Sequence, residues 1–319
     1  MKVLLNGYSG YAQLDGYDIM ATSFSLSMSE NVIKSDGAGK ILMLDSNDEI
    51  HEHYFKRFGL NAVRDYPSYS LSVSFESTFD VFQYLLLRIR SGKLSNSFSV
   101  LFKDDAAGIV YYFDKAYFTS MSLDVSNNAL AVVSMNFVMF KDYIEIAINN
   151  YNLYAKNYPP DNFIGAKMMP YWAWGVSYPG FNDGSLQGFS FSIEQQITPK
   201  FGCQGNLNDN ALGPMIVVAG VPTVTYELNY ILDEGIYVNN YGIPSNQVAM
   251  SGQSMVVKYS QSFTQLYMYP YTDSTQITFT NCYIDSYTPQ IGNPGSANAI
   301  TVSGTVYGQM FVENIRVSY

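Results

Sequence analysis

Alternation of apolar and polar residues is the main pattern along this chain. In residues 23–29 apolar side chains take every second position and serines fill the others. The same period of two is found in residues 70–76, 189–194 and 223–229, and further strand-like runs begin near 109 and 275. One apolar and one polar face is typical of half-buried antiparallel strands. The sequence therefore predicts a mainly β protein.

One segment has the period of a helix instead. Between Thr78 and Gly92 an apolar stripe recurs every three or four residues, formed by Val81, Phe82, Leu85, Leu86 and Ile89. Ser77 and Thr78 can cap its start, Asp80 lies in its first turn and Gly92 can end it. We expect this helix to pack outside the strands. The second half of the chain has no equally clear helical pattern.

The two halves of the chain resemble each other. Phe24, Ser25 and Ser27 have identical counterparts 165 residues later. Three pairs of segments align at nearly constant spacing: 23–37 with 188–202, 115–122 with 281–288, and 129–137 with 299–307. In this alignment Leu71 matches Val224. A spacing that changes only at loops indicates a copied domain, because it is too long for a solenoid repeat.

The predicted fold is therefore two tandem homologous β-barrel or sandwich domains, each with a flanking helix. The first domain is predicted at 1–150 and the second at 169–319, joined by a linker at 151–168 that contains Pro159-Pro160. An insert at 38–67 is present only in the first copy and holds most of its charge cluster. Loops of this length in compact domains are usually functional or form interfaces.

Composition and charge exclude several classes of function. The net charge is −10 and only 14% of the residues are charged, while Tyr (28) and Phe (20) are abundant. No basic patch is present, which argues against ordinary binding to nucleic-acid phosphates. No apolar run approaches the length of a membrane helix and the N-terminal apolar run is too short for a signal peptide, so no membrane anchor is expected. Low charge with many aromatics favours an aromatic-rich β protein or one whose surface is covered by partners.

No set of residues with catalytic spacing is evident. The two histidines, His51 and His53, lie in an acidic stretch and lack a third ligand, so a solvated loop is favoured over a metal site. Nucleophile-elbow and nucleotide-loop motifs are absent. The two cysteines, Cys203 and Cys282, are too few for a disulfide scaffold, and two free thiols are favoured over a bridge. We therefore expect no enzyme activity and no cofactor.

Two tryptophans allow an alternative reading. Trp172 and Trp174 stand at the start of the second copy and could form a platform on which sugar rings stack. Packing at the junction of the two domains explains them as well and is the favoured interpretation.

The second copy resembles a domain of the phage tail tube protein family. The resemblance lies in FSFSIEQQITPKFG (189–202), TVTYELNY (223–230) and a late β pair, TQITFTNCYIDSYTPQ (275–290) with ANAITVSGTVYG (297–308). In that family the late pair often has a strand, an SYxP segment, a glycine-rich turn and a returning strand. Ser286 to Pro289, Gly292 to Gly295 and Ile300 to Tyr307 fit this order. The first copy is a weaker match, and the 38–67 insert and residues 229–270 depart from the family pattern.

The resemblance implies a structural role in a virion tail. Proteins similar to this family, including secreted Hcp rings, join six β domains into a ring around a channel, and the rings stack into a tube. A duplicated chain would form such a ring as a trimer with near-sixfold shape. The implied partners are further copies of the chain, a tape measure protein, other tail proteins and DNA that passes without specific binding. Assembly is expected in the cytoplasm of the bacterial host.

The polar strand faces and the insert supply candidate sites for these roles. A strand face of Ser, Thr and Glu needs water, and the channel of a tube or the outer solvent can supply it. The candidates for the channel lining are Ser25, Ser27, Ser72, Ser74, Glu76, Ser190, Ser192, Glu194, Thr225 and Glu227. The candidates for contacts between rings, all in the insert, are Asp45, Asp48, Glu49, Glu52, Lys56 and Arg57.

Two other functions remain open from the sequence. The chain could form a different ring of the same tail, such as a distal tail or terminator protein. It could also be a carbohydrate-binding receptor module that uses the Trp172 and Trp174 segment.

Overall fold

A computed structural model gives the architecture of the chain. It describes residues 2–3, 11–34, 40–44, 50–54, 62–93, 96–104, 109–140, 144–147, 168–179, 186–200, 214, 216–231, 252–263, 271–290 and 299–318. The described residues are mainly β, as the alternating pattern predicts.

The elements follow one another along the chain with a single α-helix among the described residues. The first half contains β1 (Lys2–Val3), β2 (Tyr11–Leu14), β3 (Tyr17–Lys34), β4 (Lys40–Leu44), β5 (Ile50–Tyr54), β6 (Ala62–Glu76), α1 (Phe79–Arg90), β7 (Phe98–Asp104), β8 (Ile109–Ser126), β9 (Val132–Met139) and β10 (Ile144–Ala147). The second half contains a 3₁₀ turn (Tyr171–Ala173), β11 (Trp174–Ser177), β12 (Leu186–Glu194), β13 (Ile197–Lys200), β14 (Ile216–Ala219), β15 (Thr223–Ile231), β16 (Gln253–Phe263), β17 (Tyr271–Gln290), β18 (Ala299–Val306) and β19 (Met310–Ser318).

One large antiparallel sheet contains most of these strands. Its order is β11-β16-β17-β18-β15-β12-β8-β7-β2-β3-β6-β9, and β8 also pairs with β9. The halves meet where β12 pairs with β8, from Gly188 opposite Ser126 to Glu194 opposite Ser120. The expectation of two separate barrels or sandwiches is wrong in this respect, because the described strands form one sheet and not a pair of closed barrels. Backbone groups at the join are satisfied by pairing across the two halves.

The same order of six strands occurs in both halves. In the first half β2-β7-β8-β9-β6-β3 are neighbours in this order, and in the second half β11-β16-β17-β18-β15-β12 are. The pairing of β8 with β9 shifts register between Phe118 and Ser120, and the pairing of β17 with β18 shifts between Ile284 and Ser286. Bulges at matching places in matching strand pairs are specific features of a fold.

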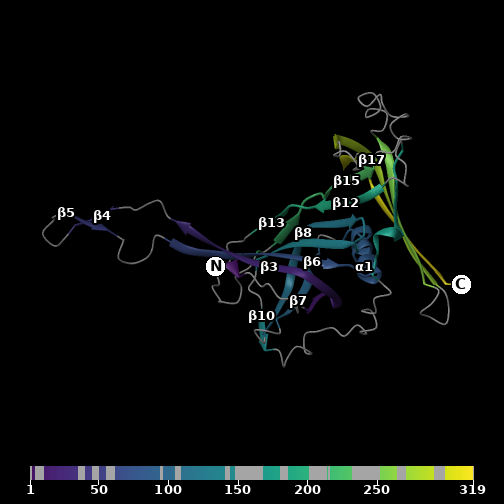
Figure 1. Cartoon of the computed structure of the whole chain (residues 1–319). Coiled ribbons are helices and arrows are strands. Elements are labelled where there is room, and N and C mark those ends of the chain that lie inside the picture. The colour runs from purple at the N-terminus through teal and green to yellow at the C-terminus, as the bar shows by residue number, and fades with distance from the viewer. Residues whose placement is uncertain are drawn as a thin grey trace.

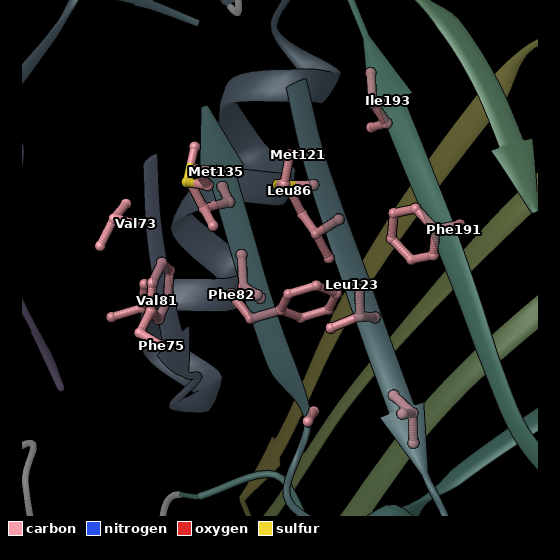
Figure 2. Close-up of a cluster of buried hydrophobic side chains, with 14 of the residues drawn as sticks. Val73, Phe75, Val81, Phe82, Leu86, Met121, Leu123, Met135, Phe191 and Ile193 are labelled. Carbon is pink, nitrogen blue, oxygen red and sulfur yellow. The ribbon is translucent and has the colours of Figure 1, made fainter. Parts of the chain in front are cut away.

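The apolar face of the sheet is covered by α1. Figure 2 shows the helix lying across β6, β9, β8 and β12, with side chains from both layers meeting between them. The labelled residues of this layer are Val73, Phe75, Val81, Phe82, Leu86, Met121, Leu123, Met135, Phe191 and Ile193. Helix and strand periods place apolar residues on facing surfaces, and their burial is the main stabilising term of the fold.

The helix lies where the sequence predicts it, but its start differs from the expectation. Thr78 precedes the first turn and makes no side-chain capping bond, while the Ser77 hydroxyl donates to the Thr78 carbonyl oxygen. Gly92 has a φ of +66°, a left-handed conformation that suits glycine after a helix end. No second α-helix is found among the described residues, so the expected helix in each half is shown only for the first half.

Arg88 fixes the end of α1 to the sheet. Its guanidinium group is paired with the Asp15 carboxylate, donates to the Tyr84 hydroxyl at 3.0 Å, and lies 3.7 Å from the centre of the Phe98 ring. It also donates to the carbonyl oxygens of Lys93, Asn96 and Ser97. Burial, followed by the hydrogen bond to Asp15, raises the pKa of Tyr84, which therefore stays neutral. This network holds α1 in place over the apolar face.

The predicted insert is partly strand. Residues 62–67 belong to β6, which continues its pairing with β3 as far as Ala62 opposite Lys34. β4 and β5 pair with each other, and Figure 1 shows them at the far end of the long β3–β6 hairpin. The predicted linker at 151–168 lies outside the described residues except for Met168, which bridges to Thr78.

Candidate functional site

The polar face of the sheet collects the predicted channel residues. Eight neighbouring strands, β3-β6-β9-β8-β12-β15-β18-β17, contribute to it. Cross-strand partners in an antiparallel sheet point to the same face, so each set of partners forms a row across the strands. One row runs through Ser23, Ser74, Ser134, Ser122, Ser192, Thr225 and Thr305. A second runs through Ser25, Ser72, Asn136, Ser120, Glu194 and Thr223.

A third row carries most of the remaining candidates. It runs through Glu76, Val132, Asp124, Ser190, Glu227, Ser303 and Ser286. Ser27 lies opposite Ser70, one step further along β3. All ten candidates are half-buried or exposed, and none is buried. The structure therefore brings them onto one surface, and their position in a channel remains a prediction.

Hydrogen bonds link many side chains along these rows. The Ser72 hydroxyl donates to the Asn136 amide oxygen, and the Asn136 amide donates to the Ser120 hydroxyl at 2.7 Å. The hydroxyl pairs Ser74–Ser134, Ser192–Thr225 and Ser286–Ser303 lie 2.8, 3.4 and 2.7 Å apart. Small side chains bonded to one another leave fewer donors for a passing ligand, which suits a surface that should not bind tightly.

The charges within these rows are all carboxylates. Glu76, Asp124, Glu194 and Glu227 lie on the face, and the rows named above contain no Lys or Arg. Asp124 and Glu227 flank Ser190 on either side and line a small hollow between β8, β12 and β15. A negative surface of this kind repels phosphate groups.

Half of the face was missed by the sequence predictions. Ser120, Ser122, Ser134, Asn136 and Ser303 come from β8, β9 and β18. Their signal is the same period of two, visible in 120–126 and 132–138, where buried and accessible residues alternate. The sequence offered no reason to place these strands between β6 and β12.

The candidates for contacts between rings are mostly untested. Asp45, Asp48, Glu49, Lys56 and Arg57 lie outside the described residues. Glu52 lies on β5 opposite Leu42, and His51 and His53 lie on the same strand opposite Met43 and Ile41.

Cys282 is a buried free thiol. Burial raises its pKa to about 11, so the thiol stays protonated and poorly reactive near neutral pH. The expected free thiol is therefore found at Cys282, while Cys203 lies outside the described residues.

The two tryptophans do not form a shared platform. Trp174 lies among aromatic rings of both halves, with centroid distances of 5.5 Å to Phe82, 5.0 Å to Tyr259 and 5.5 Å to Phe189. Trp172 is 62% exposed. Trp174 therefore packs between the two halves of the chain, whereas Trp172 is mostly exposed to solvent.

We expect Trp174→Ala to lower the free energy of unfolding by about 3 kcal/mol, because a large side chain is lost from a packed junction. Trp172→Ala is the matched control and should leave stability nearly unchanged, since that ring is mostly in solvent. Urea unfolding followed by circular dichroism measures both. Equal effects of the two substitutions would contradict the packing described above.

Comparison with protein-family models and with curated proteins identifies no relative. No protein-family model matches the chain, and no curated protein matches it. Among the described residues no helix has the length and apolar character needed to cross a membrane.

Proposed function

We propose that this protein is the structural subunit of a phage tail tube, forming stacked rings around a channel that conducts DNA. The observation that carries the proposal is the continuous polar, acidic face shared by eight strands of both halves. In a ring the apolar face packs under α1 and the polar face is free to line a channel. Such a subunit belongs in the virion tail, has no enzyme activity, and needs no cofactor.

We also infer that the chain contains two copies of one domain. Suppose that β3 is equivalent to β12 at a spacing of 165 residues and that β8 is equivalent to β17 at a spacing of 166. The strand pairings then make Leu71 equivalent to Tyr226 and Met135 equivalent to Val302. Since Met135 is equivalent to Val302, Phe137 is equivalent to Gly304. The remaining pairings fit this result, because Leu71 lies opposite Phe137 in the first half and Tyr226 lies opposite Gly304 in the second. The third register is thus an independent check on the first two, and its agreement supports a duplication.

The duplication suggests the size of the ring. If each copy fills one sixth of the circumference, two copies per chain require three chains. A head-to-tail interface of this kind closes into a ring when its rotation divides a full turn. The join of β8 with β12 inside the chain provides the geometry for side-by-side copies. The ring would be threefold in sequence and nearly sixfold in shape.

Electron microscopy of the purified protein in negative stain tests the proposal. Hollow rings or stacked tubes are expected. A compact monomer at high protein concentration, with no rings in the images, would count decisively against a tube subunit. Copy number per particle separates a tube subunit from a distal tail or terminator ring, which occurs in few copies. Binding of the monomer to a glycan array would instead favour the receptor module.

We propose that the insert contacts the next ring of the tube. At the ends of the tube the partners are a tape measure protein or other tail proteins. Removing residues 38–60 while keeping β6 should leave rings that stack poorly, because the distal part of the β3–β6 hairpin is lost. Sedimentation and microscopy measure tube length. Long tubes from the shortened chain would show that the insert has a different role.

A further inference from the structure

The join between the two halves shows how neighbouring copies pair. β8 pairs with β9 along one of its two edges. Along the other edge it pairs with β12, from Ser120 to Ser126. At the bulge of β8 the backbone N–H of Gln195 donates to the backbone carbonyl oxygen of Thr119 at 2.7 Å. The backbone groups along this edge of the first copy are therefore paired with β12 of the second copy.

The matching edge of the second copy lies on β17. β17 corresponds to β8, and its pairing with β16 ends at Cys282. Beyond this residue β18 is the only strand that the described residues place against β17.

A pair of aromatic residues next to this edge is exposed in one half only. In the first half the rings of Tyr117 and Phe140 lie 6.0 Å apart, and Phe140 is 7% exposed. At the corresponding place the rings of Tyr283 and Tyr307 lie 5.2 Å apart, and these residues are 40% and 67% exposed. Exposed aromatic groups beside a strand edge that no other described strand covers mark an interaction surface.

We propose that this edge of β17 pairs with β3 of a second copy of the chain, in the register of the β8–β12 join. Transferring the pair Glu194 and Ser120 to the equivalent strands places Ser29 opposite Ser286. The next pair on the same face is Ser27 opposite Thr288. All four residues lie on the polar face, so its rows continue from one chain to the next. This register rests on the proposed ring.

The same edge of β3 is occupied in the single chain by β1. Lys2 lies opposite Ser27 and Val3 opposite Leu26, antiparallel as β17 of the neighbour would be. β1 and the neighbour's β17 therefore compete for the same positions. β1 acts as a removable cover that protects an open edge of the free subunit and must leave before a ring closes.

Engineered disulfides test the register. Paired residues in adjacent strands have Cα atoms about 5 Å apart, within reach of a disulfide. In a Cys203→Ser background, Ser29→Cys with Ser286→Cys should give covalent dimers and trimers on mild oxidation of assembled protein. Ser25→Cys with Ser286→Cys is the control and should give none, because its partners lie four residues out of register.

The outcomes separate this interface from the proposed function. Rings that form covalent links only in the control pair, or in neither pair, would overturn the register while leaving the ring itself intact. Covalent dimers and open chains without rings would support the interface and contradict the tube.

A second pair of cysteines tests the role of β1. Lys2→Cys with Ser27→Cys should lock β1 onto β3 when oxidised. We expect the locked chain to stay monomeric and to form rings after reduction, whereas the Lys2→Cys single variant should assemble under both conditions. Ring assembly by the locked chain would overturn the role of β1 as a cover.

Discussion

Replacing Gly304 with alanine is expected to prevent stable folding. A Cβ atom at this position would lie 2.0 Å from the Tyr283 carbonyl oxygen and 2.4 Å from the Tyr226 hydroxyl oxygen. The carbonyl belongs to a paired strand and cannot move aside, and Tyr226 donates to that same oxygen at 3.0 Å. A clash of this size should cost more than about 4 kcal/mol, a large share of the stability of an ordinary domain.

Gly175→Ala is the matched control for this substitution. Gly175 also lies in a strand, β11, but among the described residues no atom beyond its chain neighbours lies within 4 Å of an added Cβ. This variant should be as stable as the parent or slightly more so, because alanine has less freedom to lose on folding. Soluble yield and the midpoint of urea unfolding compare the two. A Gly304→Ala protein with the parent's midpoint would show that the β15–β18–β17 packing is wrong.

Reversing the charge of the polar face is expected to impair DNA passage strongly. Each replacement of Glu76, Glu194 or Glu227 by Lys changes the local charge by two units. In a trimeric ring each of the three chains then contributes three lysines to the channel surface. Lysines in the channel would bind phosphates and release counterions. We expect slower DNA ejection and non-specific DNA binding that weakens steeply as salt is raised.

The triple replacement of the same residues by Gln separates charge reversal from loss of charge. Gln keeps the side-chain length without adding a cation, so ejection should be slowed much less. Both variants must first be shown to form normal tubes, since only assembled particles report on the channel. Unchanged ejection in an assembled Lys variant would remove these residues from the channel lining.

Local pattern was enough to predict the helix and the strands that form the polar face, but not strands such as β7, β16 and β19. Alternation of Phe24, Leu26 and Met28 with serines requires one wet and one buried face, and the stripe around Val81 and Leu85 requires a helix. These signals depend on near neighbours only. The sheet order depends on contacts between distant segments, so the join of β12 with β8 could not be read from the sequence.

Register was the least predictable feature. Alignment of the halves matches Leu71 with Val224, whereas under the proposed duplication the strand pairings match it with Tyr226. A slip of two residues keeps every side chain on its face, so alternation cannot detect it. If the halves are copies, the same pairings set Gly304 against the large Phe137, three residues away from the sequence alignment, and the ring of Tyr226 lies beside Gly304. Compensation between two positions is visible only in three dimensions.

The mass of an isolated ring tests the central claim, that the two halves of one chain stand side by side in a threefold ring. Native mass spectrometry, or light scattering on rings freed from tubes, gives the number of chains directly. The account predicts three chains of 35.7 kDa in each ring. A ring of six chains would place the two halves in different layers and would contradict it.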